Sequence, residues 1–127
     1  MNLLLDTHAL LWWITDNKRL SAKARSSIEK ADQVLVSSVT AWEIATKQRL
    51  GKLPEADQYV ANLEKLVKDE GMEFVPVAFA HGLRAGRYIS DHRDPFDRML
   101  AAQAELDGLI LVTRDALFKQ FPVQTLW

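Results

Sequence analysis

The sequence predicts an α/β fold in which a central parallel β-sheet is flanked by α-helices on both faces. Two observations support this prediction. Short apolar runs with the length of buried strands alternate with longer segments whose apolar residues recur every three to four positions, and capping or turn residues separate the two kinds of segment. Right-handed connections between parallel strands then place helices on both faces of the sheet.

The expected elements begin with an apolar strand at Asn2–Leu5. A helix follows at once through Ala9–Trp13, with Thr7 as its expected N-cap. A second helix is expected from Ser21, because a serine there precedes a periodic apolar pattern. Val34–Ser38 has the unbroken apolar character of a strand buried on both faces.

The middle of the chain is expected to be largely helical. One helix ends near Gly51, a residue typical of the position after a helix, and Pro54 opens the next. The apolar residues of that next helix follow the 3.6-residue period: Ala56, Tyr59, Val60, Leu63, Leu66 and Val67. Gly71 ends it, Glu73–Val77 is a strand whose proline favours an edge position, and Ala78–Tyr88 is a further helix.

The last third of the chain has the clearest helix boundaries. Asp94 as N-cap, a proline at the first helical position and Gly108 after the end frame a helix over Pro95–Asp107. Leu109–Val112 is then a buried strand, and Val123–Leu126 is a short final strand.

Composition restricts the class of protein. The 127 residues, 48% of them hydrophobic and without a low-complexity tract, predict one domain over 1–127. The absence of cysteine excludes disulfides, thiolate metal sites and cysteine nucleophiles. The apolar run before Asp6 is short and lacks a basic leader, so we expect neither a signal peptide nor a membrane span. We therefore expect a cytoplasmic protein.

Four carboxylates carry the main functional prediction. Asp6 and Asp115 follow strands, whereas Glu43 and Asp97 lie near the starts of helices. In a parallel sheet these positions share one edge, so the four acids are expected to converge. Carboxylates that converge repel one another and raise each other's pKa, and Mg²⁺ or Mn²⁺ with oxygen ligands relieves that repulsion.

Each of these four acids, and Asp94 close to Asp97, also has a structural interpretation. Asp94 is interpreted first as a helix cap, and Asp97 lies where an acid favours the helix dipole. Glu43 completes a capping-box pattern with Thr40, and Asp115 fits a turn or a cap. Asp6 either caps the following helix or lies in the crevice at the sheet edge.

The chain lacks the motifs of several competing classes of enzyme. The chain has no GxGxxG, Walker lysine loop or GxSxG element, which disfavours dinucleotide-binding, P-loop and serine-hydrolase proteins. The three histidines, His8, His81 and His92, lack metal-ligand spacing and are interpreted as structural or surface residues. A phosphatase of the haloacid dehalogenase type needs a second acid two residues after the first, where this chain has His8.

The motifs LLLDTHALLWW, SSVTAWEIATKQRLGKL, HRDPFDRMLAAQA and LVTRDALF resemble, in this order, those of the PIN-domain nucleases, specifically the VapC-type toxins of prokaryotic toxin–antitoxin modules. The resemblance covers the whole chain and implies a PIN-like fold. It implies that Asp6, Glu43, Asp97 and Asp115 bind Mg²⁺ or Mn²⁺ and that the protein cleaves RNA endonucleolytically. Supporting roles at the site would belong to three further residues: Thr7, Asp94 and Thr113.

The resemblance also implies partners. These are a VapB-like antitoxin with a disordered arm and a second copy of the chain in a homodimer. Because the net charge is only −1, any contact with RNA must be local, and the first candidates for it are Lys47, Arg93 and Arg98. A non-catalytic PIN-like module that binds RNA or protein without cutting is the alternative.

Overall fold

Five parallel strands form one sheet in the computed structural model, which describes residues 1–127, and their spatial order is β3-β2-β1-β4-β5. The strands are β1 Asn2–Leu5, β2 Gln33–Ser37, β3 Glu73–Val75, β4 Ile110–Val112 and β5 Thr125–Leu126. β1 is central and pairs in parallel with both β2 and β4. The predicted α/β class with a parallel sheet is therefore confirmed.

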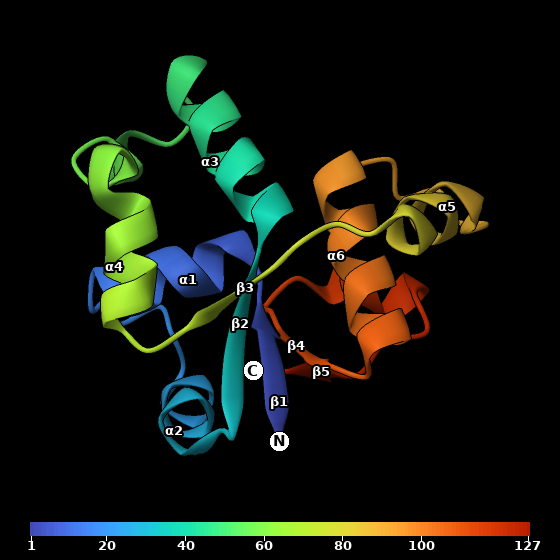
Figure 1. The fold of residues 1–127 in the computed structure, drawn as a ribbon, viewed down its shortest axis with the longest axis horizontal. Coiled ribbons are helices and arrows are strands. Elements are labelled where there is room, and N and C mark those ends of the chain that lie inside the picture. Colours follow the sequence, from blue (N-terminus) through green and yellow to red (C-terminus); the bar gives the residue numbers. More distant parts are fainter.

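Helices cover both faces of this sheet (Figure 1). They are α1 Thr7–Ile14, α2 Ala22–Lys30, α3 Ser38–Arg49, α4 Leu63–Asp69, α5 Phe79–Arg87 and α6 Pro95–Asp107. Helices α1, α2 and α4 lie on one side, and α5 and α6 lie on the other. Helix α3 continues from β2 past the edge of the sheet, between the two groups.

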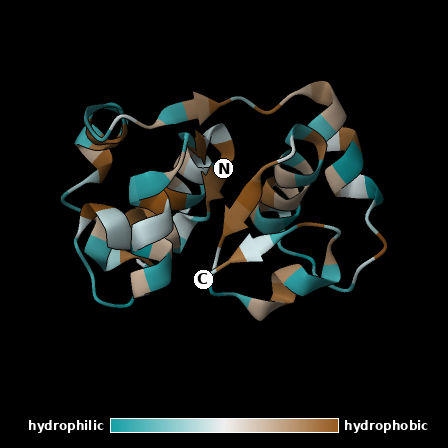
Figure 2. Cartoon of the chain, turned by 90° about the horizontal axis from the view of Figure 1, so that it is seen from below, coloured by the Kyte–Doolittle hydropathy of each residue, from teal (hydrophilic) through white to brown (hydrophobic).

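Alternation along β1 divides the apolar core in two. Leu3 and Leu5 pack into the cluster beneath α1, α2 and α4, whereas Leu4 packs with Leu100 and Leu111 into the cluster beneath α5 and α6. All three β1 leucines are fully buried. Figure 2 shows the resulting layers, with hydrophobic strands between two groups of helices.

Two helix starts differ from the prediction. Asp6, not Thr7, caps α1, because its carboxylate Oδ1 accepts a hydrogen bond from the amide of Ala9 at 2.8 Å. Ser37 caps α3 by accepting from the amide of Val39, so Thr40 and Glu43 lie inside that helix and the capping box is wrong. Asp6 directly follows β1 and Ser37 is the last residue of β2, so in both cases a polar residue where the strand ends takes the capping position.

The long helix predicted from Pro54 is also wrong. The segment forms two 3₁₀ turns, Pro54–Ala56 and Val60–Asn62, and only Leu63–Asp69 is α-helical. Its amides bond three residues back, as in Asp57 N to Pro54 O at 3.2 Å. Aspartate, tyrosine, valine and asparagine favour a helix only weakly, and burial of Leu53 and Ala56 against the core decides the path instead.

The predicted ends of α6 are confirmed. Asp94 is the N-cap, Pro95 opens the helix, and Gly108 follows with φ of 65°, a backbone conformation that glycine adopts without strain. β3 is an edge strand, as Pro76 predicted, but it ends at Val75 and not at Val77, so the proline follows the strand. None of the helices has the length and apolar character needed to cross a membrane.

Leu111 in β4 tests the importance of the central strands. Its side chain is fully buried, so Leu111→Ala should lower the free energy of unfolding by about 2–5 kcal/mol through lost burial and the cavity left behind. The matched control is Leu106→Ala on α6, where the leucine is 47% exposed and the expected change is below about 0.5 kcal/mol. Urea denaturation measures both, and equal losses would contradict the assignment of the core.

Candidate active site

All four predicted acids line one pocket of about 280 Å³ at the carboxyl edge of the sheet. Its polar lining consists of Asp6, Thr7, His8, Glu43, Lys47, His92, Asp94, Asp97 and Asp115. β1 and β4 end at this edge, and α3 starts there because it follows β2. The start of α6 lies there because a helix that leads into a parallel strand runs antiparallel to it. The predicted convergence is therefore present.

Asp6 extends the end of β1 into the pocket. Its backbone amide donates to the carbonyl of Val112 at 3.1 Å, and its carboxylate both caps α1 and faces the other acids. Burial raises the pKa of Asp6 above its usual value, although hydrogen bonds from the Thr113 hydroxyl and the Ala9 amide oppose the rise, and the charge of Glu43 adds to it. Asp6 therefore fulfils both roles that the sequence offered as alternatives: it caps α1 and it lies in the crevice at the sheet edge.

Glu43 is held from two sides. Its side chain is only 3% exposed. The hydroxyl of Thr7 donates to Oε1 at 2.5 Å, and the ammonium of Lys47, one helical turn later, pairs with Oε2. Burial lowers the pKa of Lys47, but its hydrogen bond and attraction to Glu43 outweigh that effect and leave the pKa raised. Lys47, predicted as an RNA contact, therefore lies inside the acid pocket.

Asp97 lies in the first turn of α6 beside His92. The imidazole Nε2 of His92 is 2.9 Å from Oδ2 of Asp97. Burial raises the pKa of Asp97 to about 6, and the charges of Asp94 and Glu43 add to the rise, while the hydrogen bond with His92 opposes it. Asp94 caps the helix by accepting from the amides of Phe96 and Asp97 at 2.8 and 3.2 Å, and it also lines the pocket.

Asp115 is the most exposed of the four acids. Its Oδ1 accepts from the amide of Leu117 at 2.9 Å and so caps the short 3₁₀ helix Ala116–Gln120. Its own amide donates to the hydroxyl oxygen of Thr113 at 3.1 Å. Thr113 is buried, and its hydroxyl lowers the pKa of Asp6, so this threonine lies near both the acid that follows β1 and the acid that follows β4.

The pocket offers oxygen ligands of the kind that hard divalent cations prefer. Five carboxylates face one ammonium, and burial, with the charges of neighbouring acids added, raises the pKa values of Asp6 and Asp97. As the side chains are placed, however, no three acids or imidazoles are grouped closely enough to hold one ion. Lys47 and His92 occupy lone pairs of Glu43 and Asp97 that a metal would take.

Sequence reasoning missed the position of His92, which was interpreted as structural or surface. Metal-ligand spacing was the wrong criterion for it. The available signal was its place five residues before Asp97, in the segment that leads into α6. A loop of that length brings the imidazole back over the first turn of the helix.

Arg98, predicted as an RNA contact, is hydrogen-bonded to the backbone of its own chain. Its guanidinium donates to the backbone carbonyls of Ala85 and His92, each at 2.9 Å, and to those of Tyr88 and Ser90. Three carbonyls of the α5–α6 connection and one of α5 are thus held by one side chain, and this connection carries His92. Arg93, in contrast, is exposed.

Comparison with known proteins identifies the family of this chain. The model of the PIN domain family matches residues 3–124, and the chain belongs to that family. Within the family it is similar to the VapC proteins: it is 32% identical to "Ribonuclease VapC22" of Mycobacterium tuberculosis over 115 residues, which are 88% of this chain and 85% of that protein.

Solved structures share the fold. The crystal structure of DNA-bound VapBC from Salmonella typhimurium has a TM-score of 0.71 at 18% identity and covers 99% of this chain and 97% of its own. VapBC2 from Rickettsia felis, bound to a DNA fragment from the promoter, has a TM-score of 0.68 at 17% identity, with 99% and 98% covered. The PIN-like fold predicted from the motifs is therefore confirmed.

Arg98→Lys tests the clamp on the α5–α6 connection. A single ammonium cannot reach four carbonyls, so the free energy of unfolding should fall by about 2 kcal/mol, and the amides of residues 88–92 should exchange faster. Arg93→Lys, at an exposed arginine of the same connection, is the matched control and should change neither quantity. Denaturation and hydrogen exchange followed by mass spectrometry measure these effects. Unchanged exchange in Arg98→Lys would show that the clamp does not hold the loop.

Proposed function

We propose that this protein is a metal-dependent endoribonuclease and the toxin of a toxin–antitoxin pair. The observation that carries the proposal is the convergence of Asp6, Glu43, Asp97 and Asp115 in one pocket of a PIN-family chain. The relative named as a ribonuclease supports RNA as the substrate. The reaction is hydrolysis of a phosphodiester bond within the RNA chain.

The roles of the acids follow from their places in the pocket. Bound Mg²⁺ or Mn²⁺ would lower the pKa of water and polarise the phosphoryl oxygen. Asp6 and Asp97 would hold the ion, with Asp115 completing the set. Glu43, which is hydrogen-bonded to Thr7 and paired with Lys47, would orient the attacking water or help to hold a second ion. Because water attacks the phosphorus and the ribose 2′-oxygen takes no part, the products carry a 5′-phosphate and a 3′-hydroxyl.

Among the basic residues, Lys47 and Arg93 are the stronger candidates for contact with RNA. Lys47 lies at the acid pocket and Arg93 is exposed beside it, whereas the hydrogen bonds of Arg98 go to backbone carbonyls. The alternative function, a PIN-like module that binds RNA or protein without cutting, predicts no cleavage at any metal concentration. A cleavage assay with purified protein and Mg²⁺ or Mn²⁺ separates the two.

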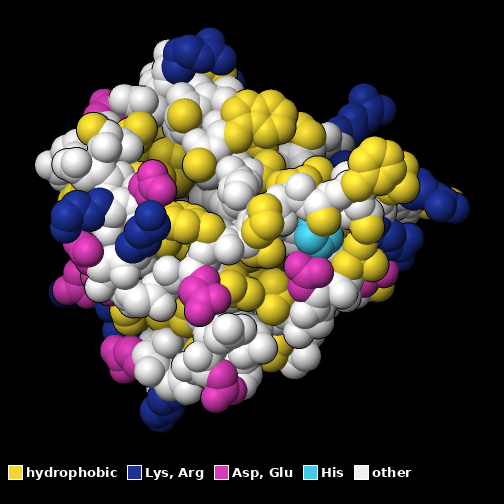
Figure 3. All heavy atoms as spheres, in the orientation of Figure 1, with side chains coloured by type: hydrophobic (Ala, Val, Ile, Leu, Met, Phe, Trp, Pro, Cys, Tyr) yellow, Lys and Arg dark blue, Asp and Glu magenta, His cyan; other side chains and the backbone are white.

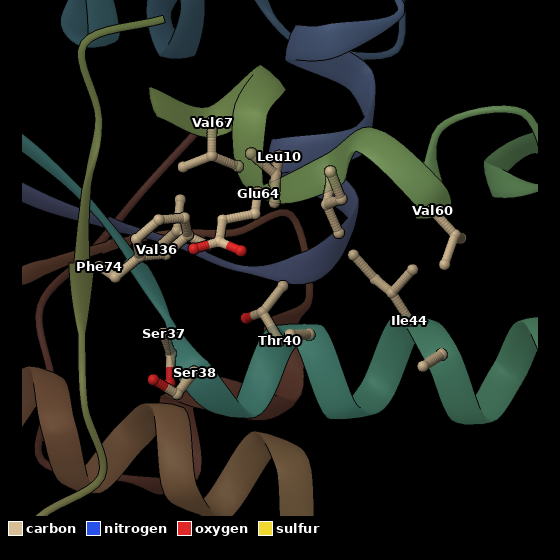
Figure 4. A pocket seen from close by; sticks show the side chains of 13 residues that line it. Leu10, Val36, Ser37, Ser38, Thr40, Ile44, Val60, Glu64, Val67 and Phe74 are labelled. Carbon is tan, nitrogen blue, oxygen red and sulfur yellow. The ribbon is translucent and has the colours of Figure 1, made fainter. Parts of the chain in front are cut away.

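A VapB-like antitoxin is the proposed partner. The protein has an apolar groove of about 430 Å³ between α3 and α4, reaching Leu10 of α1 and Phe74 of β3. Figure 3 shows this hollow on the surface, and Figure 4 shows the side chains of α3 and α4 facing one another across it. A disordered arm that orders on binding would bury apolar side chains here, and its polar groups could reach the buried hydroxyl of Thr40, which has no partner.

The same arm would inhibit the nuclease by charge. An arginine or lysine that reaches Asp6, Asp97 or Asp115 would form charge-assisted hydrogen bonds and displace the metal. The proposed assembly also contains two copies of this chain. Large apolar side chains are exposed on and beside α5, namely Phe79, Leu83 and Ile89, and burial in a dimer would remove them from water.

Replacement of single acids tests the proposed chemistry. Asp6→Asn or Asp97→Asn should abolish RNA cleavage at saturating Mg²⁺, because each removes a negatively charged ligand. Both carboxyls have raised pKa values, so their ionised forms destabilise the fold above those values, and each amide should leave the melting temperature at neutral pH unchanged or higher. Asp91→Asn, at an exposed acid outside the pocket, is the control. Near-normal cleavage by either variant would show that the acids are wrongly assigned.

The groove between α3 and α4 can be tested separately from the acids. Ala45 lines the groove and is exposed, and it lies on the opposite side of α3 from Glu43. Ala45→Arg should weaken binding of the protein encoded by the adjacent reading frame at least tenfold by filling the groove, without changing RNA cleavage in its absence. Ala61→Arg, at an exposed alanine outside the groove, is the matched control. Titration calorimetry measures the affinity, and light scattering on the same samples gives the mass of the assembly. Equal affinities of the two variants would place the arm elsewhere.

A further inference from the structure

A second cleft adjoins the acid pocket. It has a volume of about 290 Å³ and is lined by Asp6, His8, Trp12, Arg114, Asp115 and Trp127. We propose that this cleft binds the nucleotide next to the cleaved phosphate of a single-stranded RNA, with Arg114 on a phosphate and the base stacked on His8 or Trp127. The inference rests on the proposed nuclease function and adds the site that holds the substrate.

The two hollows form one continuous path. Asp6, His8 and Asp115 line both of them. An RNA strand whose reacting phosphate lies at the acids must leave the pocket on one side or the other. On the side of α1 and the 3₁₀ segment after Asp115 it enters the second cleft directly. The volume of this cleft, about 290 Å³, lies just below the range for pockets that enclose drug-sized ligands, about 300 to 1000 Å³, so the cleft has room for one nucleotide and no more.

Aromatic rings form one side of the cleft. Trp12 is only 4% exposed and packs edge-on against Trp127, with ring centroids 5.7 Å apart, and against His8 at 5.3 Å. The buried indole therefore acts as a rigid support. His8 is exposed and Trp127 is partly exposed, so these two rings present area to a base. Base–aromatic stacking of this kind binds single strands of varied sequence.

Arg114 supplies the positive charge. Its guanidinium lies 4.6 Å from the centre of the Trp12 ring, and the side chain makes no hydrogen bond or ion pair within the protein, although two acids line the same cleft. Contact with the face of the indole leaves the five N–H donors of the guanidinium free. A phosphate oxygen accepts from such a fork in a bidentate manner. Arg114 is exposed, so this phosphate can reach it from solvent.

A nucleotide fits this cleft better than a peptide arm does. Charged and aromatic side chains make up its lining, whereas the groove between α3 and α4 is larger and lined mainly by aliphatic side chains. The structure also contains a matched control for Arg114. Arg19 lies over the same indole, at 6.0 Å, but it lines a different hollow and does not reach the acids.

The experiment uses the full chain and a fluorescently labelled, mixed-sequence 12-nucleotide single-stranded RNA, with Ca²⁺ replacing Mg²⁺ to suppress cleavage. Arg114→Gln should weaken binding at least fivefold and reduce the slope of log affinity against log salt by about 0.7, the value for one phosphate contact on a single strand. His8→Ala should weaken binding at least fivefold with an unchanged slope, because stacking is lost and the number of phosphate contacts is not. Arg19→Gln should bind as the unaltered protein does.

A second measurement needs no substitution. RNA containing 4-thiouridine, crosslinked to the unaltered protein by light, should attach to the peptides that contain His8 and Trp127. Crosslinks confined to other surfaces would overturn the proposal, as would Arg114→Gln and His8→Ala proteins that fold normally and bind RNA with unchanged affinity. If Arg114→Gln or His8→Ala weakened binding of the protein encoded by the adjacent reading frame but left the RNA affinity unchanged, the cleft would belong to a protein partner. That result would also overturn the proposal. An unaltered protein that neither binds nor cleaves RNA would instead overturn the proposed function itself.

Discussion

Parallel pairing of β1 with β2 on one side and β4 on the other is the constraint on which this molecule depends. The pairing buries three consecutive leucines, two toward one helical layer and one toward the other, and so joins both halves of the core through a single four-residue strand. It also aligns the carboxyl ends of the strands. Asp6 and Thr113 meet because their strands are hydrogen-bonded neighbours, and the helices that follow or precede these strands bring Glu43 and Asp97 to the same edge.

The arrangement that makes the site useful also strains it electrostatically. Burial, with repulsion between the acids added, raises the pKa values of Asp6 and Asp97, and hydrogen bonds from Thr113 and Ala9 to Asp6 and from His92 to Asp97 oppose the rise. Glu43 is held in turn by Thr7 and Lys47. In the proposed nuclease, a metal ion would replace some of these internal partners, and its affinity would reflect the difference between the two sets of contacts.

The surroundings of the acids divide into surfaces of different chemistry. The groove between α3 and α4 is mainly aliphatic, whereas the cleft beside Trp12 combines aromatic rings with an unpaired guanidinium. An apolar peptide and a nucleic acid strand would therefore occupy separate surfaces, and only the acids would be common to both. Under the proposed scheme, inhibition acts by occupation of the acids and does not require the partner to cover the whole substrate path.

The sequence by itself determined the features that depend on neighbouring residues. These include the alternation of strands and helices, the ends of α6 set by Asp94 and Gly108, and the edge position of the strand before Pro76. The convergence of the acids was also predictable, because the geometry of a parallel sheet is general. The tertiary structure alone decided the broken helix after Pro54, where burial overrode the apolar period, and the partners of His92, Arg98 and Arg114. Long polar side chains reach several residues away from their own backbone, so their contacts depend on which elements the fold brings alongside, and no local pattern in the chain encodes that.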